Sequence, residues 1–96
     1  ERIINKSGAY AFGMSGSGLQ FLTDGSNIVT SSVALTAGTL YHVAMVVSDT
    51  TGDGTQDANY YVDGTFVETV VGTDATIASN TNTLQIGSVA GASNFW

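Results

Sequence analysis

The chain lacks cysteine and proline and is poor in basic residues. Without cysteine, its 96 residues form neither disulfide bonds nor thiolate metal sites. Only Arg2 and Lys6 carry positive charge, against eight carboxylates, so the net charge is −6. A phosphate backbone is held by several Lys or Arg side chains. The composition therefore argues against nucleic acid and against an anionic membrane surface as partners.

Long hydrophobic runs are missing as well. No apolar stretch approaches the ~20 residues that span a bilayer, so we expect no membrane insertion. Charged residues make up 10% of the chain, against about 25% in typical soluble domains. Thr, Ser, Gly and Asn fill the difference, a composition common among strand-rich secreted proteins. We expect an extracellular or cell-surface protein of one domain at most.

No segment has the apolar periodicity of a helix. Short apolar blocks alternate with Gly and Asn/Asp clusters, which predicts strands joined by tight turns and packed as an antiparallel β-sandwich. An example is the Asp63-Gly64 pair, which predicts a hairpin turn. The strands expected from these blocks are residues 3–6, 10–14, 19–21, 27–31, 39–48, 60–63, 65–71 and 83–87.

The longest apolar run covers residues 39–48. Tyr41, Val43, Met45 and Val47 occupy one face of this expected strand. The opposite face is also mostly apolar, with Leu40, His42, Ala44 and Val46. Strands that are apolar on both faces are typical of sheets covered on both sides. We therefore expect this strand at the centre of a sheet, with both faces buried.

Six short motifs follow one another along the chain: Ile4-Asn5-Lys6, residues 10–12, residues 18–21, residues 37–44, Tyr61-Val62-Asp63-Gly64 and Leu84-Gln85-Ile86-Gly87. Their order resembles that of laminin-G-like domains of the concanavalin-A-like lectin/glucanase family, and it covers nearly the whole chain. The sharpest match is residues 37–44, which resemble that family's G-x-W-x-H-V-A strand. The resemblance implies an all-β jelly roll.

Two departures from the family pattern affect what we expect. Leu40 stands where the family usually has Trp, which reduces one core anchor. The family domain is also considerably longer, with strands before Ile3 and after Trp96. Residues 1–96 are therefore expected to be a single laminin-G-like domain or its central fragment, with terminal strands missing or supplied by other chains. Something must then satisfy the unpaired backbone groups along the sheet edges.

The loop at residues 49–57 is the best candidate metal site. Asp49, Thr51, Asp53 and Asp57 fall at positions one, three, five and nine of a calcium-loop pattern, with Gly54 at position six. The match is incomplete, because position twelve is Tyr60 and not the bidentate Glu. Two interpretations stay open: a Ca²⁺ site, to which Asp24 or Asp74 would contribute, or a solvated loop between strands.

Residues that would support catalysis are scarce. Glycoside hydrolysis needs two positioned carboxylates, and the only glutamates are Glu1 and Glu68. His42 is the only histidine, and the family match places it inside a central strand as a structural residue. No Ser/His/Asp arrangement is visible either. We expect no enzyme activity.

Two classes of function remain. The first is a recognition or adhesion module that binds a glycan or an extracellular protein, with calcium organising its loops. Exposed Tyr60 or Tyr61 side chains would stack on sugar rings, although tyrosines in strands more often pack in the core or across strands. The second is a subunit of a surface layer or filament, in which copies of the chain complete one another's sheets by strand addition.

Overall fold

A computed structural model describes residues 2–23, 27–74 and 76–87. Within these ranges the chain forms strands and no helix, so no helix in the described part is able to cross a membrane. The strands are β1 (Arg2–Lys6), β2 (Tyr10–Ser15), β3 (Gly18–Thr23), β4 (Asn27–Ala34), β5 (Val43–Ser48), β6 (Asp57–Val62), β7 (Thr65–Val70) and β8 (Leu84–Ile86). The turn expected at Asp24 lies outside the described residues.

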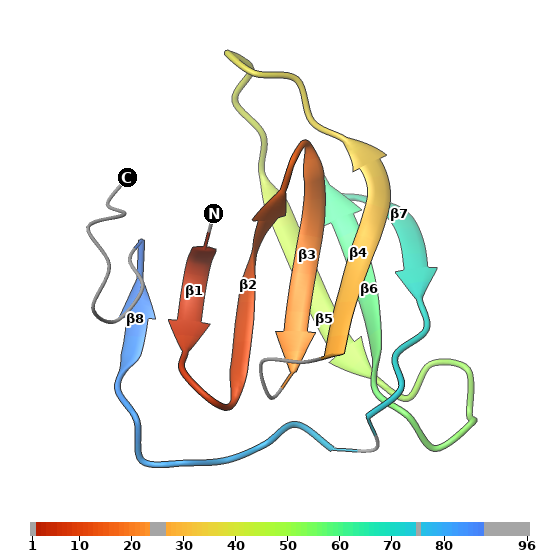
Figure 1. Cartoon of the computed structure of the whole chain (residues 1–96). Helices are drawn as coiled ribbons and strands as arrows, with labels where there is room; N and C mark the ends of the chain where they lie inside the picture. The colour runs from red at the N-terminus through yellow and green to blue at the C-terminus, as the bar shows by residue number, and fades with distance from the viewer. Residues whose placement is uncertain (1, 24–26, 75, 88–96) are drawn as a thin grey trace.

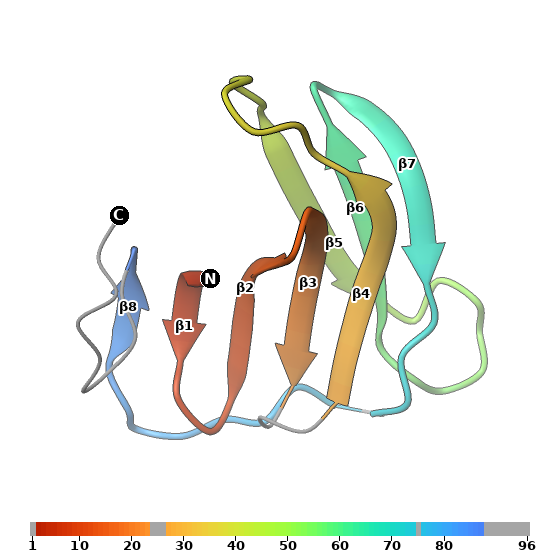
Figure 2. The same cartoon turned by 45° about the horizontal axis from the view of Figure 1, so that its top comes forward.

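The strands form two sheets that face each other (Figures 1 and 2). The larger sheet has the order β4-β3-β2-β1-β8, and the smaller one has the order β5-β6-β7. Every strand pair is antiparallel. The expected all-β antiparallel sandwich is therefore confirmed. Whether residues 1–96 are a whole domain or its central part stays a prediction.

The β6–β7 hairpin follows directly from the local sequence. Asp63 and Gly64 both have positive φ, at 50° and 78°. Two consecutive residues in this region form the tight turn whose twist matches the flanking strands, and Asp-Gly is a preferred pair for it. The hairpin expected around Asp63-Gly64 is confirmed.

The core lies between the two sheets and comes from alternate residues of β2, β3, β4 and β6. Tyr60 is its largest fully buried side chain, and its hydroxyl donates a hydrogen bond of 2.6 Å to the Val29 carbonyl of the opposite sheet. Tyr60 is therefore a core residue and is not available to a ligand. The buried cluster consists of Phe12, Leu19, Phe21, Val29, Ala58 and Tyr60.

The prediction that residues 39–48 form a central, doubly covered strand is wrong. The strand begins only at Val43, and β5 is the edge of the three-stranded sheet. Val46 on its outer face is 51% exposed, and Leu40 before the strand is 97% exposed. The apolar pattern identified the strand correctly, but pattern alone does not report which neighbours a strand acquires. Leu40 is not a core anchor.

His42 also lies elsewhere than expected. It is exposed and precedes β5, where its backbone N–H donates to the Asp63 carboxylate at 2.8 Å. Its carbonyl accepts the Asp63 N–H at 2.7 Å. This reciprocal pair ties the entry of β5 to the β6–β7 turn. The expectation of a His inside a central strand is therefore wrong, although its backbone has a structural role.

The two sheets differ in width, so the sandwich is closed on one side and open on the other. On the closed side, β4 lies against β6 and β7. On the open side, β1 and β8 of the larger sheet extend beyond β5 (Figures 1 and 2). The inner surface of these two strands has no facing strand in the described part of the chain.

Candidate functional site

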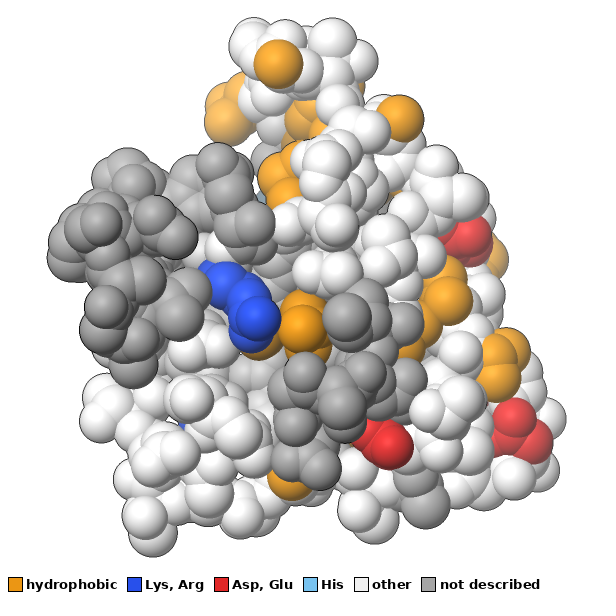
Figure 3. All heavy atoms as spheres, viewed as in Figure 1, with side chains coloured by type: hydrophobic (Ala, Val, Ile, Leu, Met, Phe, Trp, Pro, Cys, Tyr) orange, Lys and Arg blue, Asp and Glu red, His pale blue; other side chains and the backbone are white. Residues whose placement is uncertain are grey.

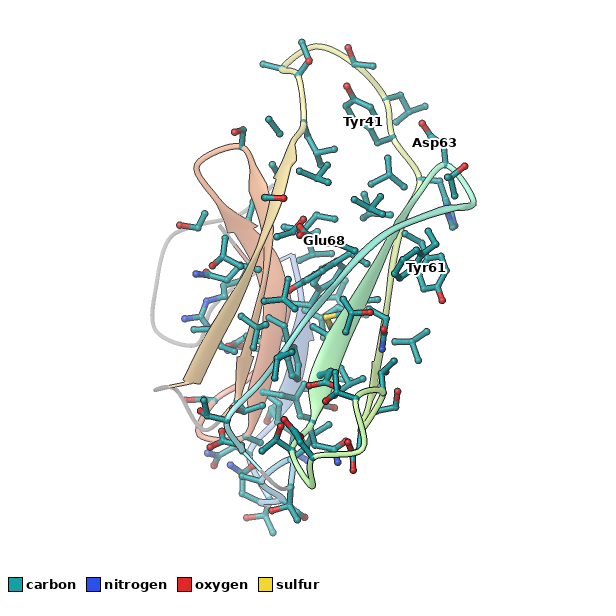
Figure 4. All side chains as sticks on the ribbon, turned by 90° about the vertical axis from the view of Figure 1, so that its right-hand side faces the viewer. Tyr41, Tyr61, Asp63 and Glu68 are labelled. Carbon is teal, nitrogen blue, oxygen red and sulfur yellow. The ribbon has the colours of Figure 1, made fainter. Side chains whose placement is uncertain are left out.

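The outer face of the three-stranded sheet carries an aromatic pair. Tyr61 on β6 and Phe66 on β7 contact each other edge to face, with ring centroids 5.6 Å apart and an interplanar angle of 67°. Phe66 is 53% exposed, and the Tyr61 side chain points away from the sandwich (Figure 4). Because side chains alternate along a strand, Tyr60 enters the core while Tyr61 faces solvent. Cross-strand packing of Tyr61 is thus confirmed, and part of the pair stays open to a ligand.

Polar side chains continue this outer face along the same strands. The Asn59 amide donates hydrogen bonds to the Thr50 hydroxyl at 2.7 Å and to the Val46 carbonyl at 3.2 Å. Its carbonyl oxygen accepts the Thr69 hydroxyl at 2.7 Å. Asn59 is buried, with 6% of its surface exposed, and its amide is engaged by these partners, so it holds the sheet and the following loop together and is not available to a ligand.

The loop between β5 and β6 is held by its own carboxylates. Asp49 accepts the N–H groups of Gly52 at 2.7 Å and Gly54 at 3.1 Å. Asp53 accepts the N–H and the hydroxyl of Thr55 at 2.8 and 2.6 Å. The hydroxyl of Thr55 is the main cause that lowers the pKa of Asp53. Both carboxylates are exposed and act as acceptors within the loop.

Asp57 begins β6 and is fully buried at the base of this loop. One carboxylate oxygen accepts the Thr50 N–H, the Thr51 N–H and the Thr51 hydroxyl at 2.9–3.0 Å. The other accepts the Gly72 N–H at 3.2 Å. Burial raises the pKa of Asp57, but the hydrogen bonds from Thr51 and Gly72 outweigh it, and the net pKa lies below the usual value. Asp57 therefore joins the loop to the segment that follows β7.

The proposed calcium ligands are only partly brought together. Thr51 and Asp57 are in contact, while Asp49 and Asp53 bind loop N–H groups. In the described ranges, no three Asp, Glu or His side chains form a group suited to a metal ion. The Asp74 carboxylate accepts the Thr23 hydroxyl, while its backbone carbonyl accepts the Gln56 N–H of the loop at 2.7 Å. Asp24 lies outside the described residues. The calcium site stays a prediction.

Sequence reasoning missed an inter-sheet contact at Glu68. Its carboxylate accepts hydrogen bonds from the Ser31 hydroxyl and from the Ser32 N–H, and both its oxygens lie 3.1 Å from the Ser32 hydroxyl. The Ser31 hydrogen bond is the main cause that lowers the pKa of Glu68. Figure 4 shows this side chain between the sheets. The pairing of Glu68 with the core residue Tyr60 includes a register shift, so no sequence pattern signalled this contact.

An apolar groove lies on the open side of the sandwich, where β1 and β8 extend beyond β5. Its volume is about 540 Å³. The loop that borders it is held in part by the Tyr41 hydroxyl, which accepts the Thr36 N–H at 3.3 Å. The residues that line the groove come from both sheets and from this loop: Ile3, Met14, Leu19, Leu35, Thr39, Leu40, Tyr41, Val43, Ile86 and Gly87.

A model of laminin-G domains, described as the concanavalin A-like lectin/glucanases superfamily, matches residues 1–96. The chain belongs to this superfamily. Searches among curated proteins and among solved structures found no match. The resemblance read from the ordered motifs is therefore confirmed, and the sandwich described above is the fold that the superfamily implies.

Membership in the concanavalin A-like superfamily indicates a carbohydrate- or protein-binding module. The description names glucanases as well as lectins, so the expectation of no enzyme activity stays a prediction. The charged residues are distributed unevenly over the sandwich. Arg2 and Lys6 are the only basic residues, and both lie on β1 of the larger sheet. In Figure 3 the basic atoms lie on the β1 side of this lectin-like sandwich, and the acidic atoms lie on the β4 and β7 side.

Proposed function

We propose that this chain is an extracellular recognition module that binds a glycan on the outer face of the three-stranded sheet. The observation that carries the proposal is the partly exposed Tyr61–Phe66 pair on this face. The superfamily supports a binding role and leaves the ligand open between carbohydrate and protein. The aromatic face favours carbohydrate, because ring faces stack on the C–H surfaces of sugars.

The charge distribution favours a neutral glycan. Sulfated or carboxylated sugars need cationic partners, and neither Arg2 nor Lys6 lies on the three-stranded sheet. The net charge of −6 also repels anionic ligands. A neutral saccharide would stack on Phe66 and Tyr61.

Removing the aromatic pair is expected to abolish most of the glycan affinity. A glycan array identifies the ligand, and calorimetry then compares variants with the natural chain. Tyr61→Ala and Phe66→Ala should each weaken binding about tenfold, since an aromatic contact contributes on the order of 1 kcal/mol beyond its buried area. Tyr61→Phe should retain most of the affinity, because the ring is preserved.

Val71→Ala provides the matched control, because Val71 is also exposed and apolar but lies after the end of β7. Equal affinity of the natural chain and Tyr61→Ala would contradict the proposal. If no glycan on the array binds and a protein ligand is found whose binding needs Phe66, the same surface would be a protein-binding site instead.

We further propose that Ca²⁺ binds the loop at residues 49–57 and assists recognition. Calorimetric titration of the purified chain with calcium should then release or absorb heat at millimolar concentrations. Asp53→Asn should remove this heat, whereas Asp63→Asn, in the turn at the opposite end of β6, should leave it unchanged. Because Asp53 is exposed and bonds only within the loop, its replacement leaves the fold intact. An absence of heat, or an unaltered titration of Asp53→Asn, would reject the calcium proposal.

The alternative function is a subunit of an extracellular surface layer or filament, assembled by strand complementation between copies. The observation that favours it is the difference in width between the sheets, which leaves β5 as an edge beside an apolar groove. Electron microscopy of the purified chain distinguishes the two functions: regular polymers support assembly, and single particles support the recognition module.

A further inference from the structure

The outer face of the three-stranded sheet carries polar groups on either side of the Tyr61–Phe66 pair. On one side these groups are already engaged: the buried Asn59 amide is bonded to Thr50, and its carbonyl oxygen accepts the Thr69 hydroxyl. This end of the face is closed by the loop between β5 and β6, to which Thr50 belongs. A saccharide stacked on the rings therefore needs polar partners at the opposite end, where β5 begins and the β6–β7 turn lies.

His42 lies at this opposite end, on the same face as Tyr61. Val43, the next residue, packs toward the core, and side chains alternate along a strand, so His42 faces outward. Ala44, which also faces outward, is the direct cross-strand partner of Tyr61. His42 is therefore a diagonal neighbour of this tyrosine, within reach of one bound ligand. Its side chain is exposed, and all its hydrogen bonds within the described part of the chain are made by the backbone.

Asp63 places a carboxylate next to this histidine. Its Oδ1 atom accepts the His42 N–H at 2.8 Å, and its own N–H donates to the His42 carbonyl at 2.7 Å. These two hydrogen bonds fix the two residues relative to each other. Asp63 is exposed, and its second carboxylate oxygen accepts no hydrogen bond from the residues that the structure describes. Figure 4 shows Asp63 and Tyr61 at the same end of β6.

We propose that His42 and Asp63 are the polar part of the glycan site and select a saccharide with two neighbouring hydroxyl groups at the edge of the stacked ring. One hydroxyl group donates to the second Asp63 oxygen. The adjacent hydroxyl group bonds to the His42 imidazole, which in its neutral form offers both a donor and an acceptor. This selection rests on the glycan-binding function proposed above, and it adds the groups that choose among neutral glycans.

The aromatic pair alone provides little of this selectivity, because stacking depends on a flat C–H face that many sugars share. Hydrogen bonds are directional, and a site built to bond a hydroxyl group rejects an analogue that lacks it. An acceptor that carries charge also forms stronger hydrogen bonds than a neutral one. Because Asp63 is already tied to the His42 backbone, little side-chain freedom is lost when a ligand binds.

The experiment titrates the full chain with two neutral sugars and follows binding by NMR. Methyl β-glucopyranoside has a flat C–H face and neighbouring ring hydroxyl groups. Its 3-deoxy analogue keeps the face but has no neighbouring pair of ring hydroxyl groups. The natural chain should bind the 3-deoxy analogue about tenfold more weakly, which corresponds to one lost hydrogen bond to a charged group. Equal affinity for the two sugars would overturn the proposal.

Variants test the protein side of the same contact. Asp63→Asn should weaken binding of methyl β-glucopyranoside about fivefold and change binding of the 3-deoxy analogue by less than about twofold. The fold is kept, because asparagine adopts positive φ and its carbonyl still accepts the His42 N–H. His42→Ala should also reduce the preference between the two sugars, whereas His42→Gln, which retains a donor and an acceptor, should restore part of it. Val71→Ala, after the end of β7, should leave both affinities unchanged.

The results also distinguish this proposal from the function on which it rests. If Tyr61→Ala weakens binding but Asp63→Asn and His42→Ala keep the sugar preference of the natural chain, the aromatic surface binds glycan and the two polar residues do not belong to the site. If both polar variants lose the two sugars equally, these residues support only the turn, and the proposal is overturned as well. No binding of methyl β-glucopyranoside, when another glycan on the array binds, overturns the selection and leaves the glycan-binding function in place.

Discussion

Replacing Asp57 by Ala is expected to lower the melting temperature of the chain by about 10 °C or more. The carboxylate is fully buried and accepts four hydrogen bonds from Thr50, Thr51 and Gly72. Its removal leaves the Thr51 and Gly72 N–H groups without this acceptor at the base of the loop, while the Thr50 N–H keeps the Ser48 carbonyl. Buried donors that lose a charged acceptor are among the most costly losses in a small domain. Thermal unfolding followed by circular dichroism measures the effect.

Asp53→Ala is the matched control, because this carboxylate belongs to the same loop but is exposed and accepts hydrogen bonds from residues of the loop itself. Its melting temperature should remain within ~2 °C of the natural value. The two variants also separate the interpretations of the loop. A loop organised chiefly by calcium would lose stability in both variants, and only when calcium is present. Equal melting temperatures of Asp57→Ala and the natural chain would contradict the structural role.

The pH dependence of the Asp57 effect has a definite sign. The pKa of Asp57 is lower in the folded state than its unfolded value of about 3.9. Its contribution is therefore fully present above pH ~4 and is lost as the pH falls through the folded pKa. Asp57→Asn should accordingly lose less stability than the natural chain on acidification. Because the pKa of Glu68 is also lowered, part of the acid sensitivity should remain in that variant.

Truncation of Tyr60 is the second change with a large expected effect. Tyr60→Ala should reduce the free energy of unfolding by ~3–5 kcal/mol, because it leaves a cavity between the sheets and removes the hydrogen bond to Val29. Domains of this size are stable by only about 5–15 kcal/mol. The variant is therefore expected to be partly unfolded at 37 °C, as urea denaturation would show. A loss below ~1 kcal/mol would mean that Tyr60 is not central to the core.

Tyr60→Phe isolates the hydroxyl group. It should cost about 1 kcal/mol near neutral pH, the usual net contribution of a buried hydrogen bond. Burial raises the pKa of Tyr60 from 10.0 to about 12. The stability linked to this neutral hydroxyl is present below pH 10 and is lost as the pH rises through the folded pKa. Above that pH, the free energy of unfolding is lower by about 2–3 kcal/mol than it would be with Tyr60 neutral.

The stability advantage of the natural chain over Tyr60→Phe should therefore shrink to zero between pH 10 and 12 and then reverse, because the loss on ionisation exceeds the initial advantage. Urea denaturation at several alkaline pH values measures this change. Tyr61→Phe is the matched control, because Tyr61 lies on the outer face and is not a member of the buried core. A difference that stays constant across this range would show that the Tyr60 hydroxyl is not desolvated.

The order of strands along the chain was readable from the sequence because it depends on local geometry. Alternation places Tyr10, Phe12 and Met14 on one face of β2, and all three pack toward the core. The Asp63-Gly64 pair required a tight turn, and it forms one. The ordered motifs then led to the superfamily. Each of these features involves residues that are neighbours in the chain.

Other features were not readable, because they depend on which distant segments meet. The apolar pattern before and within β5 predicted a covered central strand, yet β5 is an edge and Leu40 is exposed. The candidate calcium loop was located by its spacing, but its carboxylates are engaged by the loop itself. The inter-sheet contact of Glu68 with Ser31 joins residues that no local pattern connects.

By itself the sequence determined the all-β class, the hairpins and the family, because alternation and turn chemistry act between residues that are close along the chain. Only the tertiary structure decided that Tyr60 is core while Tyr61 faces solvent, that Asp57 is a buried acceptor, and that β5 is left as an edge beside a groove. These outcomes depend on how the five-stranded sheet packs against the three-stranded sheet. Sheet order is set by contacts between distant segments, and side-chain periodicity within one strand does not encode it.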